Sequence, residues 1–222
     1  MDGPSGSGKS SAARGAARHL GLCYLDTGAM YRALTWWMLR AGIDVGDQAQ
    51  VAANAARPLI EIGTDPDHSW VTVDGADVTG AIRSREVSNA VSLVSAVPAV
   101  RARMVAAQRG IITGARAAGR GIVLEGRDIG TVVAPDAAVK VFLTASETAR
   151  AQRRVKDLSA DPAATFALTR DELARRDRLD STRAASPLLK AADAVEIDTT
   201  HVSLDDVIAR IVGLAAHRTV SA

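Results

Sequence analysis

The chain has 222 residues, 47% of them hydrophobic and 23% charged, which is the composition of one globular domain with a sizeable core and room for a small insertion. Its net charge of +2 and its 3% of aromatic residues do not favour a nucleic-acid-binding protein, because there is little on which bases would stack. The single cysteine, Cys23, excludes a disulfide framework and a cysteine-based metal site. No apolar run has the length of a membrane span and no signal pattern opens the chain, so we expect a cytoplasmic location.

Residues 3 to 10 form a complete phosphate-binding loop, G-x-x-x-x-G-K-[ST], reading Gly3-Pro4-Ser5-Gly6-Ser7-Gly8-Lys9-Ser10. Its glycines let successive backbone N–H groups turn toward phosphate oxygens. Lys9 is expected to reach the β- and γ-phosphates, the Ser10 hydroxyl to ligate Mg²⁺, and Ser11 to continue the ATP-binding segment into a helix. A flexible Gly/Ser-rich linker would not require the Lys-Ser pair or the helix behind it. The loop therefore predicts a site for a nucleoside triphosphate.

A helix over 11–20 and a short apolar strand over 22–25 follow the loop, as at the beginning of a βαβ unit. Thr27 is placed to cap the next helix. The apolar stripe of that helix has helical spacing at Leu34, Trp37, Met38 and Ala41.

The middle of the chain changes character. Apolar residues at 59–62 and 70–73 predict two strands, and Asp74-Gly75 predicts a hairpin turn, so we expect a small antiparallel insertion. Two helices follow, over 84–96 and from Pro98 to about residue 118.

The alternation then returns. Short buried strands at 121–125 and 139–143 are typical of a parallel sheet covered on both faces. Arg-rich helices over 150–158 and 169–179 and a strand over 194–197 come next. A last helix opens at Ser203, with an inward face that includes Leu204, Val207, Ile208 and Ile211. The pattern predicts an α/β fold, a doubly wound parallel sheet with helices on both faces and a small antiparallel insertion.

Polar segments follow two of the predicted strands directly, at 26–32 and 125–131, where an open α/β sheet binds its ligand. The second segment presents Arg127 and Asp128 at its tip. A third candidate set is Arg176, Asp180 and Arg183, whose spacing places them on one helix face, although such a row alone is more often an exposed ion-paired stripe.

With these residues in place, the chain resembles the bacterial cytidylate kinases, which belong to the nucleoside monophosphate kinases. The resemblance covers essentially the whole chain, in the order and approximate spacing of the family. The segments that carry it are Asp2-Gly3-Pro4-Ser5-Gly6, Leu25-Asp26-Thr27-Gly28-Ala29-Met30-Tyr31-Arg32, Glu125-Gly126-Arg127-Asp128-Ile129-Gly130-Thr131-Val132-Val133, Arg176-Asp177 and Asp180-Ser181-Thr182-Arg183. The phosphate loop is shared by many kinases, whereas Gly-Arg-Asp-Ile-Gly-Thr is far more specific.

The resemblance implies transfer of the γ-phosphoryl group of ATP to CMP or dCMP in pyrimidine nucleotide metabolism, with Mg²⁺ as cofactor. It implies a single P-loop kinase domain with a core at about 1–40, 110–145 and 190–222, a monophosphate-binding insertion at about 41–109 and a lid at about 146–170. ATP, CMP and dCMP are the expected partners, with no nucleic acid and no membrane, and we expect a monomer.

The resemblance also implies roles for individual residues. Lys9 and Arg127 are expected to be catalytic. The acceptor phosphate would be held by Arg32, Arg127 and Arg183, with Thr27 nearby in the substrate site. Cytosine would be read by Ser92, Arg101 and Asp128, and the sugar by Arg176 and Asp180. Lid residues that would close over the ATP phosphates are Arg150, Arg153 and Arg154.

Three alternatives remain open. A P-loop kinase of another small acceptor, such as UMP or a sugar acid, would share most of these features. A GTPase switch is disfavoured because we see no Asn-Lys-x-Asp segment for reading guanine. A nucleic-acid-binding protein is disfavoured by the low aromatic content.

Only Met1 and Asp2 precede the phosphate loop, where a doubly wound sheet has a central strand. Removing such a strand leaves backbone donors and acceptors unpaired, so we expect the 222-residue chain to be unstable or inactive. We expect the natural polypeptide to start roughly five to fifteen residues upstream.

Overall fold

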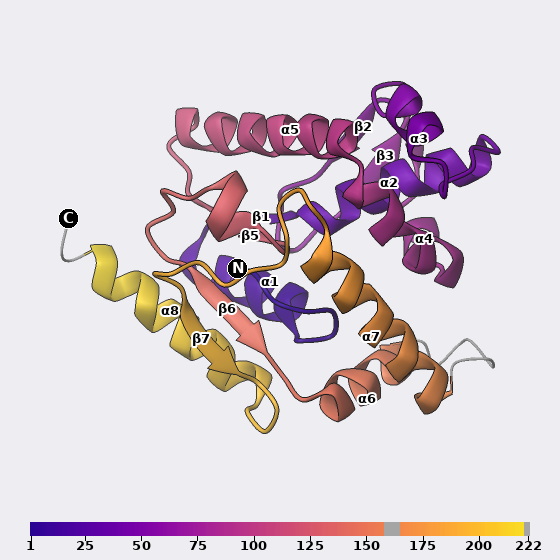
Figure 1. Cartoon of the computed structure of the whole chain (residues 1–222). Helices are drawn as coiled ribbons and strands as arrows, with labels where there is room; N and C mark the ends of the chain where they lie inside the picture. Colours follow the sequence, from indigo (N-terminus) through magenta and orange to yellow (C-terminus); the bar gives the residue numbers. More distant parts are fainter. Residues whose placement is uncertain (158–164, 220–222) are drawn as a thin grey trace.

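The parallel strands form two pairs in the computed structural model, which describes residues 1–157 and 165–219 (Figure 1). β1, Cys23–Asp26, pairs with β5, Ile122–Glu125, and β6, Val141–Thr144, pairs with β7, Val195–Asp198. Both pairings are parallel, and helices lie around them. The predicted α/β fold with a parallel sheet and a separate antiparallel sheet is confirmed.

Met1 and Asp2 lie between the two pairs of strands. The N–H of Gly126 donates to the carbonyl oxygen of Met1 at 2.9 Å. Asp2 donates its N–H to the carbonyl oxygen of Val141 at 2.9 Å and accepts from the N–H of Leu143 at 2.8 Å. The order across the sheet is therefore β1, β5, Met1 with Asp2, β6 and β7, and the phosphate loop leaves from its centre.

Helices cover this sheet and surround its carboxyl edge. In chain order they are α1 Lys9–Leu20, α2 Thr27–Arg40, α3 Gln48–Asn54, α4 Arg85–Ala96, α5 Pro98–Ala117, α6 Glu147–Asp157, α7 Phe166–Thr182 and α8 Leu204–Thr219. The α1 helix packs so closely on α8 that a Cβ at Gly15 would lie 2.3 Å from Cδ1 of Ile208. On the other side, α2 contacts α4, α4 contacts α7, and α7 contacts α6.

The antiparallel insertion is confirmed. Its strands are β2 Ile60–Ile62, β3 Val71–Val73 and β4 Ala76–Asp77, and the short 3₁₀ helix η1, Ala81–Arg83, follows. The predicted hairpin turn has φ of 50° at Asp74 and 81° at Gly75, the positive values that a tight hairpin requires. The sheet packs its valines against α2, so the insertion is anchored to the helix that follows β1.

Two predicted core positions are wrong because they stand at helix ends. Leu34 and Met38 of α2 are buried, whereas Ala41 lies one residue beyond that helix and is exposed. Leu204 is the first residue of α8 and is 47% exposed, while Val207, Ile208 and Ile211 of the predicted inner face are buried. The side chain of a residue at a helix end lies beyond the surface on which the helix packs, so it stays exposed to solvent.

The predicted helix cap at Thr27 is also wrong. The carboxylate of Asp26 accepts the N–H of Ala29 at 2.9 Å and caps α2, so Thr27 becomes the first helical residue. Its hydroxyl donates instead to the carbonyl oxygen of Glu125 at 2.6 Å. This bond ties the end of β1 to the end of β5.

No single helix within residues 1–157 and 165–219 is long and apolar enough to cross a membrane. Helices α4 and α5 meet that test of length and composition only as a pair, and they are bent by 96° where they meet.

Candidate active site

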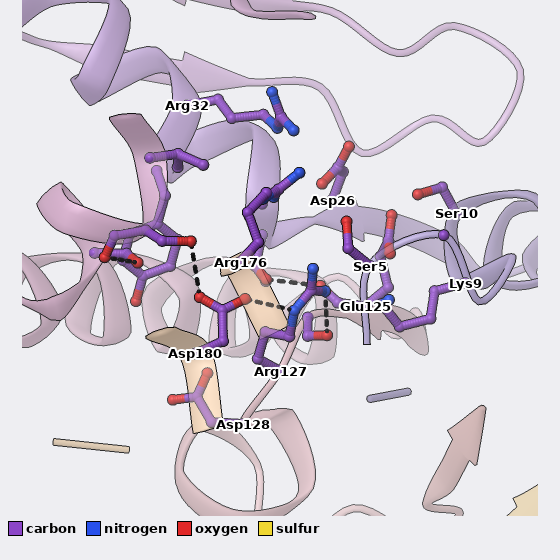
Figure 2. A pocket seen from close by; sticks show the side chains of 18 of the residues that line it. Ser5, Lys9, Ser10, Asp26, Arg32, Glu125, Arg127, Asp128, Arg176 and Asp180 are labelled. Atoms are coloured by element: carbon purple, nitrogen blue, oxygen red, sulfur yellow. Dashed lines mark hydrogen bonds and ion pairs between the residues drawn. The ribbon is translucent and has the colours of Figure 1, made fainter. Parts of the chain in front are cut away.

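A cavity of about 410 Å³ opens beyond the carboxyl ends of β1 and β5, where an open α/β sheet places its ligand. Side chains reach it from the phosphate loop, from α2, α4, α6 and α7, and from the segment after β5 (Figure 2). The predicted site residues that line it are Ser5, Gly6, Gly8, Lys9, Ser10, Ser11, Thr27, Arg32, Ser92, Arg101, Arg127, Asp128, Arg153, Arg154, Arg176, Asp180 and Arg183. The predicted residues that do not line it are Gly3, Pro4, Ser7 and Arg150.

The phosphate loop has the conformation that its glycines allow. Gly8 has φ of 87° and stands as the N-cap of α1, so the helix begins at Lys9, two residues before the expected 11–20 range. Gly3 has φ of 146°, and a Cβ there would lie 2.1 Å from the carbonyl oxygen of Leu143, so no other residue fits. The first turn of α1 contains no acidic residue, and its positive dipole end is open to an anion in the cavity.

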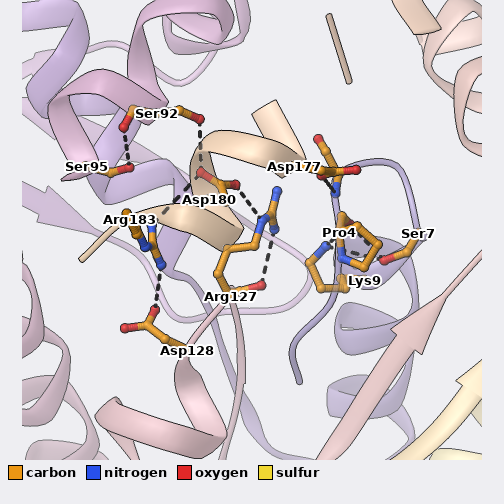
Figure 3. Close-up of polar contacts among 12 residues, drawn as sticks. Pro4, Ser7, Lys9, Ser92, Ser95, Arg127, Asp128, Asp177, Asp180 and Arg183 are labelled. Carbon is orange, nitrogen blue, oxygen red and sulfur yellow. Dashed lines mark hydrogen bonds and ion pairs between the residues drawn. The ribbon is translucent and has the colours of Figure 1, made fainter. Parts of the chain in front are cut away.

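Lys9 is folded back onto the loop. Its Nζ donates to the carbonyl oxygen of Pro4 at 2.7 Å and to Oγ of Ser7 at 3.4 Å (Figure 3). Burial, followed by the positive charge of Arg127, lowers the pKa of Lys9 from 10.5 to about 7. A phosphate group beside Nζ would restore the charged form, so the lysine is adapted to an anionic ligand.

Oxygen ligands suited to Mg²⁺ gather next to the loop. Glu125 is buried and accepts a hydrogen bond from the hydroxyl of Tyr24 at 2.9 Å, and the Ser10 side chain lines the same cavity. Burial and then the charge of Asp26 raise the pKa of Glu125. The described residues hold no cluster of three or more His, Cys, Asp or Glu side chains that would hold a metal unaided. The hydroxyl and carboxylate here fit a Mg²⁺ ion that takes its remaining ligands from phosphates and water.

Asp180 organises the arginines on the other side of the cavity. Its Oδ2 accepts a hydrogen bond from the Nε–H of Arg127, and its Oδ1 accepts one from the hydroxyl of Ser92, both at 3.0 Å (Figure 3). Nη1 of Arg183 lies 4.0 Å from the same Oδ1. Burial acts to raise the pKa of Asp180, but the charges of Arg127, Arg176 and Arg183 outweigh it and hold that pKa below the usual range. The carboxylate therefore stays charged and orients the guanidinium groups around it.

Asp128 lies at the far end of this row, buried and ion-paired with Nη2 of Arg101. Nη2 of Arg183 is 3.7 Å from its other oxygen. The α7 helix ends at Thr182, so Arg183 is not on the predicted helix face, yet its extended backbone still brings it to the cavity. Among the described residues, Nε of Arg101 and Nη2 of Arg183 have no hydrogen-bond acceptor. Each is a buried donor open to a ligand.

Like charges crowd the middle of the cavity. Arg32 donates to Oγ of Ser88 at 2.9 Å, and Arg154 donates to the same oxygen at 3.2 Å. Burial, then the charges of Arg176 and Arg154, lowers the pKa of Arg32 well below its ordinary value. Burial, then Arg127, lowers the pKa of Arg176 to about 10. Such a set of cations is arranged for a multiply charged anion.

The lid arginines differ in what they contact. Arg153 donates to Oγ1 of Thr199 at 2.9 Å and to its carbonyl oxygen at 2.5 Å. Arg150 is buried behind the phosphate loop and donates to the carbonyl oxygen of Ser5 at 3.1 Å. The predicted lid at about 146–170 includes residues 158–164, which lie outside the described residues.

Sequence reasoning missed Arg83 as a cavity residue. Arg83 lines the cavity from η1 and forms an ion pair with Asp26 at 2.9 Å. The two residues are 57 positions apart in the chain. No motif surrounds it, so only the folding of the insertion against α2 reveals its place.

The comparisons with known proteins agree with this geometry. The family described as "Cytidylate kinase" matches residues 1–217. Proteins named cytidylate kinase are 53% identical in Streptomyces griseus, over 100% of this chain and 94% of the relative, and 56% identical in Streptomyces coelicolor, over 98% and 92%. A third, from Geobacillus kaustophilus, is 46% identical over 98% of this chain and 96% of its own. A phosphate loop facing an arginine-rich pocket, in a chain matched along nearly its whole length, makes this protein a member of the cytidylate kinase family of ATP-dependent phosphotransferases.

Proposed function

We propose that this chain transfers the γ-phosphoryl group of ATP to CMP or dCMP, giving CDP or dCDP, in the pyrimidine nucleotide metabolism of the cytoplasm. The observation that carries the proposal is that one cavity joins the phosphate loop to the buried pair of Asp128 and Arg101. The first is a site for a triphosphate, and the second offers polar groups for the edge of a base.

ATP would place its β- and γ-phosphates over the loop. The N–H groups at the start of α1 and the ammonium of Lys9 would surround them, with Arg153 and Arg154 on the α6 side of the cavity. Ser10 and Glu125 would hold Mg²⁺ together with the phosphates. When bound, that ion supplies positive charge to the phosphate oxygens and orients them.

The acceptor would lie across the cavity, with its phosphate among Arg32, Arg127 and Arg183. Guanidinium groups match phosphate oxygens with two parallel hydrogen bonds, and the charge of three of them suits a dianion. The Asp180 carboxylate, which now holds Arg127 and Ser92, would meet the sugar together with Arg176.

Cytosine recognition follows from the sign of the charge at Asp128. The carboxylate accepts a hydrogen bond from the N4 amino group of cytosine, whereas uracil presents an acceptor oxygen at that position. Two acceptors facing each other repel, so the pocket disfavours UMP. The cytidylate kinase relatives agree with this preference and give no support to the UMP alternative.

Phosphoryl transfer depends chiefly on positioning and on charge stabilisation, so the site needs no strong general base. Lys9 and Arg127 both line the cavity, close enough for the charge of Arg127 to lower the pKa of Lys9. They would stabilise the charge on the group in transit.

The test is a panel of CMP, dCMP, UMP, AMP and GMP, each with ATP and Mg²⁺, read as ADP release. We expect turnover with CMP and dCMP and far less with the others. Equal turnover with UMP, or ATP hydrolysis that no acceptor stimulates, would overturn the proposal. Light scattering on the active protein tests the expected monomer.

A further inference from the structure

Asp177 joins the tip of the phosphate loop to two helices. Its Oδ1 accepts the N–H of Ser5 at 2.9 Å, and its Oδ2 forms an ion pair with Nη1 of Arg150. The same Nη1 donates to the carbonyl oxygen of Ser5 at 3.1 Å. Both polar groups of the Ser5 backbone are thus engaged, one by a carboxylate on α7 and the other by a guanidinium on α6. Figure 3 shows Asp177 beside the phosphate loop, near Pro4 and Lys9.

This ring of contacts is shielded from solvent. The side chain of Asp177 is 17% exposed and that of Arg150 is 9% exposed. Behind the loop, a Cβ on Gly6 would lie 3.1 Å from Cβ of Arg150, so α6 supports the tip directly. Charge-assisted hydrogen bonds in such a setting are stronger than those between exposed groups.

Asp177 also stands one turn from Asp180 on α7, and the two carboxylates form hydrogen bonds with different groups. Asp180 orients Arg127 and Ser92, which lie on the acceptor side. Asp177 holds Ser5 and Arg150, which lie on the loop side. Neither the cavity lining nor the roles assigned above include Asp177.

We propose that Asp177 is a positioning residue for the ATP site: through Ser5 and Arg150 it holds the tip of the phosphate loop in the conformation that binds the triphosphate. A loop that samples other conformations binds more weakly, in proportion to the fraction of molecules in the competent one. The inference rests on the proposed function only in taking ATP as the ligand of the loop.

The experiment measures binding by calorimetry of a non-hydrolysable ATP analogue and, separately, of CMP. Asp177→Asn keeps an acceptor for the N–H of Ser5 but removes the charge that holds Arg150. We expect it to raise the Kd of the analogue about five- to fiftyfold while the Kd of CMP changes less than about twofold. Arg150→Gln is expected to give a similar loss that does not add to that of Asp177→Asn, because both changes break one ring.

The control is Asp171→Asn, on the same helix but exposed, whose ion pair among the described residues is with its neighbour Arg170 at 3.5 Å. It should leave both affinities unchanged. An Asp177→Asn protein with unchanged affinity for the analogue, or with equal losses for both ligands, would overturn the proposal, since equal losses indicate general damage to α7.

If Asp177→Asn does not fold, two measurements still decide. Asp177→Glu retains the charge and should bind the analogue more tightly than Asp177→Ala, and the Ser5 amide of the unaltered protein should be protected from hydrogen exchange. An unprotected amide, or equal affinities of the two variants, contradicts the proposal. Because the readout is binding, failure of CMP phosphorylation by the unaltered protein would reject the proposed function and leave this test standing.

Discussion

The lowered pKa of Lys9 predicts that ATP binding takes up a proton. In the free protein, burial and then the charge of Arg127 lower that pKa to about 7. Phosphate oxygens beside Nζ favour the charged ammonium, and they would raise the pKa toward or above its ordinary value of 10.5. The ammonium would then be charged in the complex throughout the neutral range.

The size of the effect follows from the two pKa values. At pH 8 a group of pKa 7 carries about 0.1 proton, so binding should take up about 0.9 proton at this residue. At pH 6 the group is already charged, and uptake should fall to about 0.1 proton.

The same pKa shift also gives the sign of the pH dependence of stability. A base whose pKa is lowered by folding is charged more readily in the unfolded chain, so the contribution of Lys9 to stability increases as pH rises from about 7 toward 10.5.

Calorimetry in two buffers of different ionisation enthalpy measures the uptake. At pH 8 the enthalpies of binding observed in the two buffers should differ by the number of protons taken up multiplied by the difference between the ionisation enthalpies of the buffers. At pH 6 the two enthalpies should nearly agree. Lys9→Met, which keeps the length but not the charge, should bind more weakly and show no difference at either pH. Enthalpies independent of buffer at pH 8 in the unaltered protein would mean that Lys9 is already charged before ATP arrives, and the reasoning would be wrong.

Three further substitutions test the acceptor side. Arg127→Lys keeps the charge but loses the two-pronged geometry, so kcat/KM for CMP should fall about 10- to 100-fold, and values like those of the unaltered enzyme would remove Arg127 from the site. Asp128→Asn should lower the ratio of kcat/KM for CMP over UMP by about 5- to 150-fold, corresponding to about 1 to 3 kcal/mol; both substrates meet the same folded molecules, so an unchanged ratio cannot be blamed on instability. Asp2 accepts the N–H groups of Ile129 and Gly130, both at 2.8 Å, directly after Asp128. Because Asn accepts only one of them, Asp2→Asn should lower stability by about 1 to 3 kcal/mol and raise KM for CMP more than KM for ATP, and equal changes in the two KM values would count against it.

Periodicity made most of the fold predictable from the sequence. Short apolar runs and helical stripes located the elements, and Asp74-Gly75 located the hairpin, because each pattern reflects local geometry. The errors concern ends, namely the cap assigned to Thr27 and the inward positions assigned to Ala41 and Leu204. Where a helix ends depends on what the helix packs against. Which residue caps it depends on whether a side chain bonds to the helix or, as Thr27 does, to a carbonyl oxygen of a neighbouring strand. Neither is a local property.

Most residues of the cavity lining could be marked from the sequence, but their hydrogen-bond and ion-pair partners could not. Motifs after β1 and β5 marked Arg32, Arg127 and Asp128 because strand ends are where ligands bind. The bond from Ser92 to Asp180 spans 88 positions in the chain, and no spacing rule reaches that far. Asp177 stands beside residues that the resemblance marked, yet only the structure shows that it faces the phosphate loop rather than the acceptor.

The charge distribution explains how a nearly neutral chain makes a strong anion site. The 27 basic and 25 acidic residues almost cancel overall, but the lining of the cavity gathers eight arginines from distant segments against five carboxylates. The lowered pKa values of Arg32 and Arg176 record the desolvation and mutual repulsion of these side chains. A phosphate placed among these groups reverses both effects, because it supplies the opposite charge and the missing acceptors. The repulsion between these arginines opposes folding of the protein without ligand, and a bound phosphate removes it. A substrate that binds only the folded protein should therefore raise its free energy of unfolding.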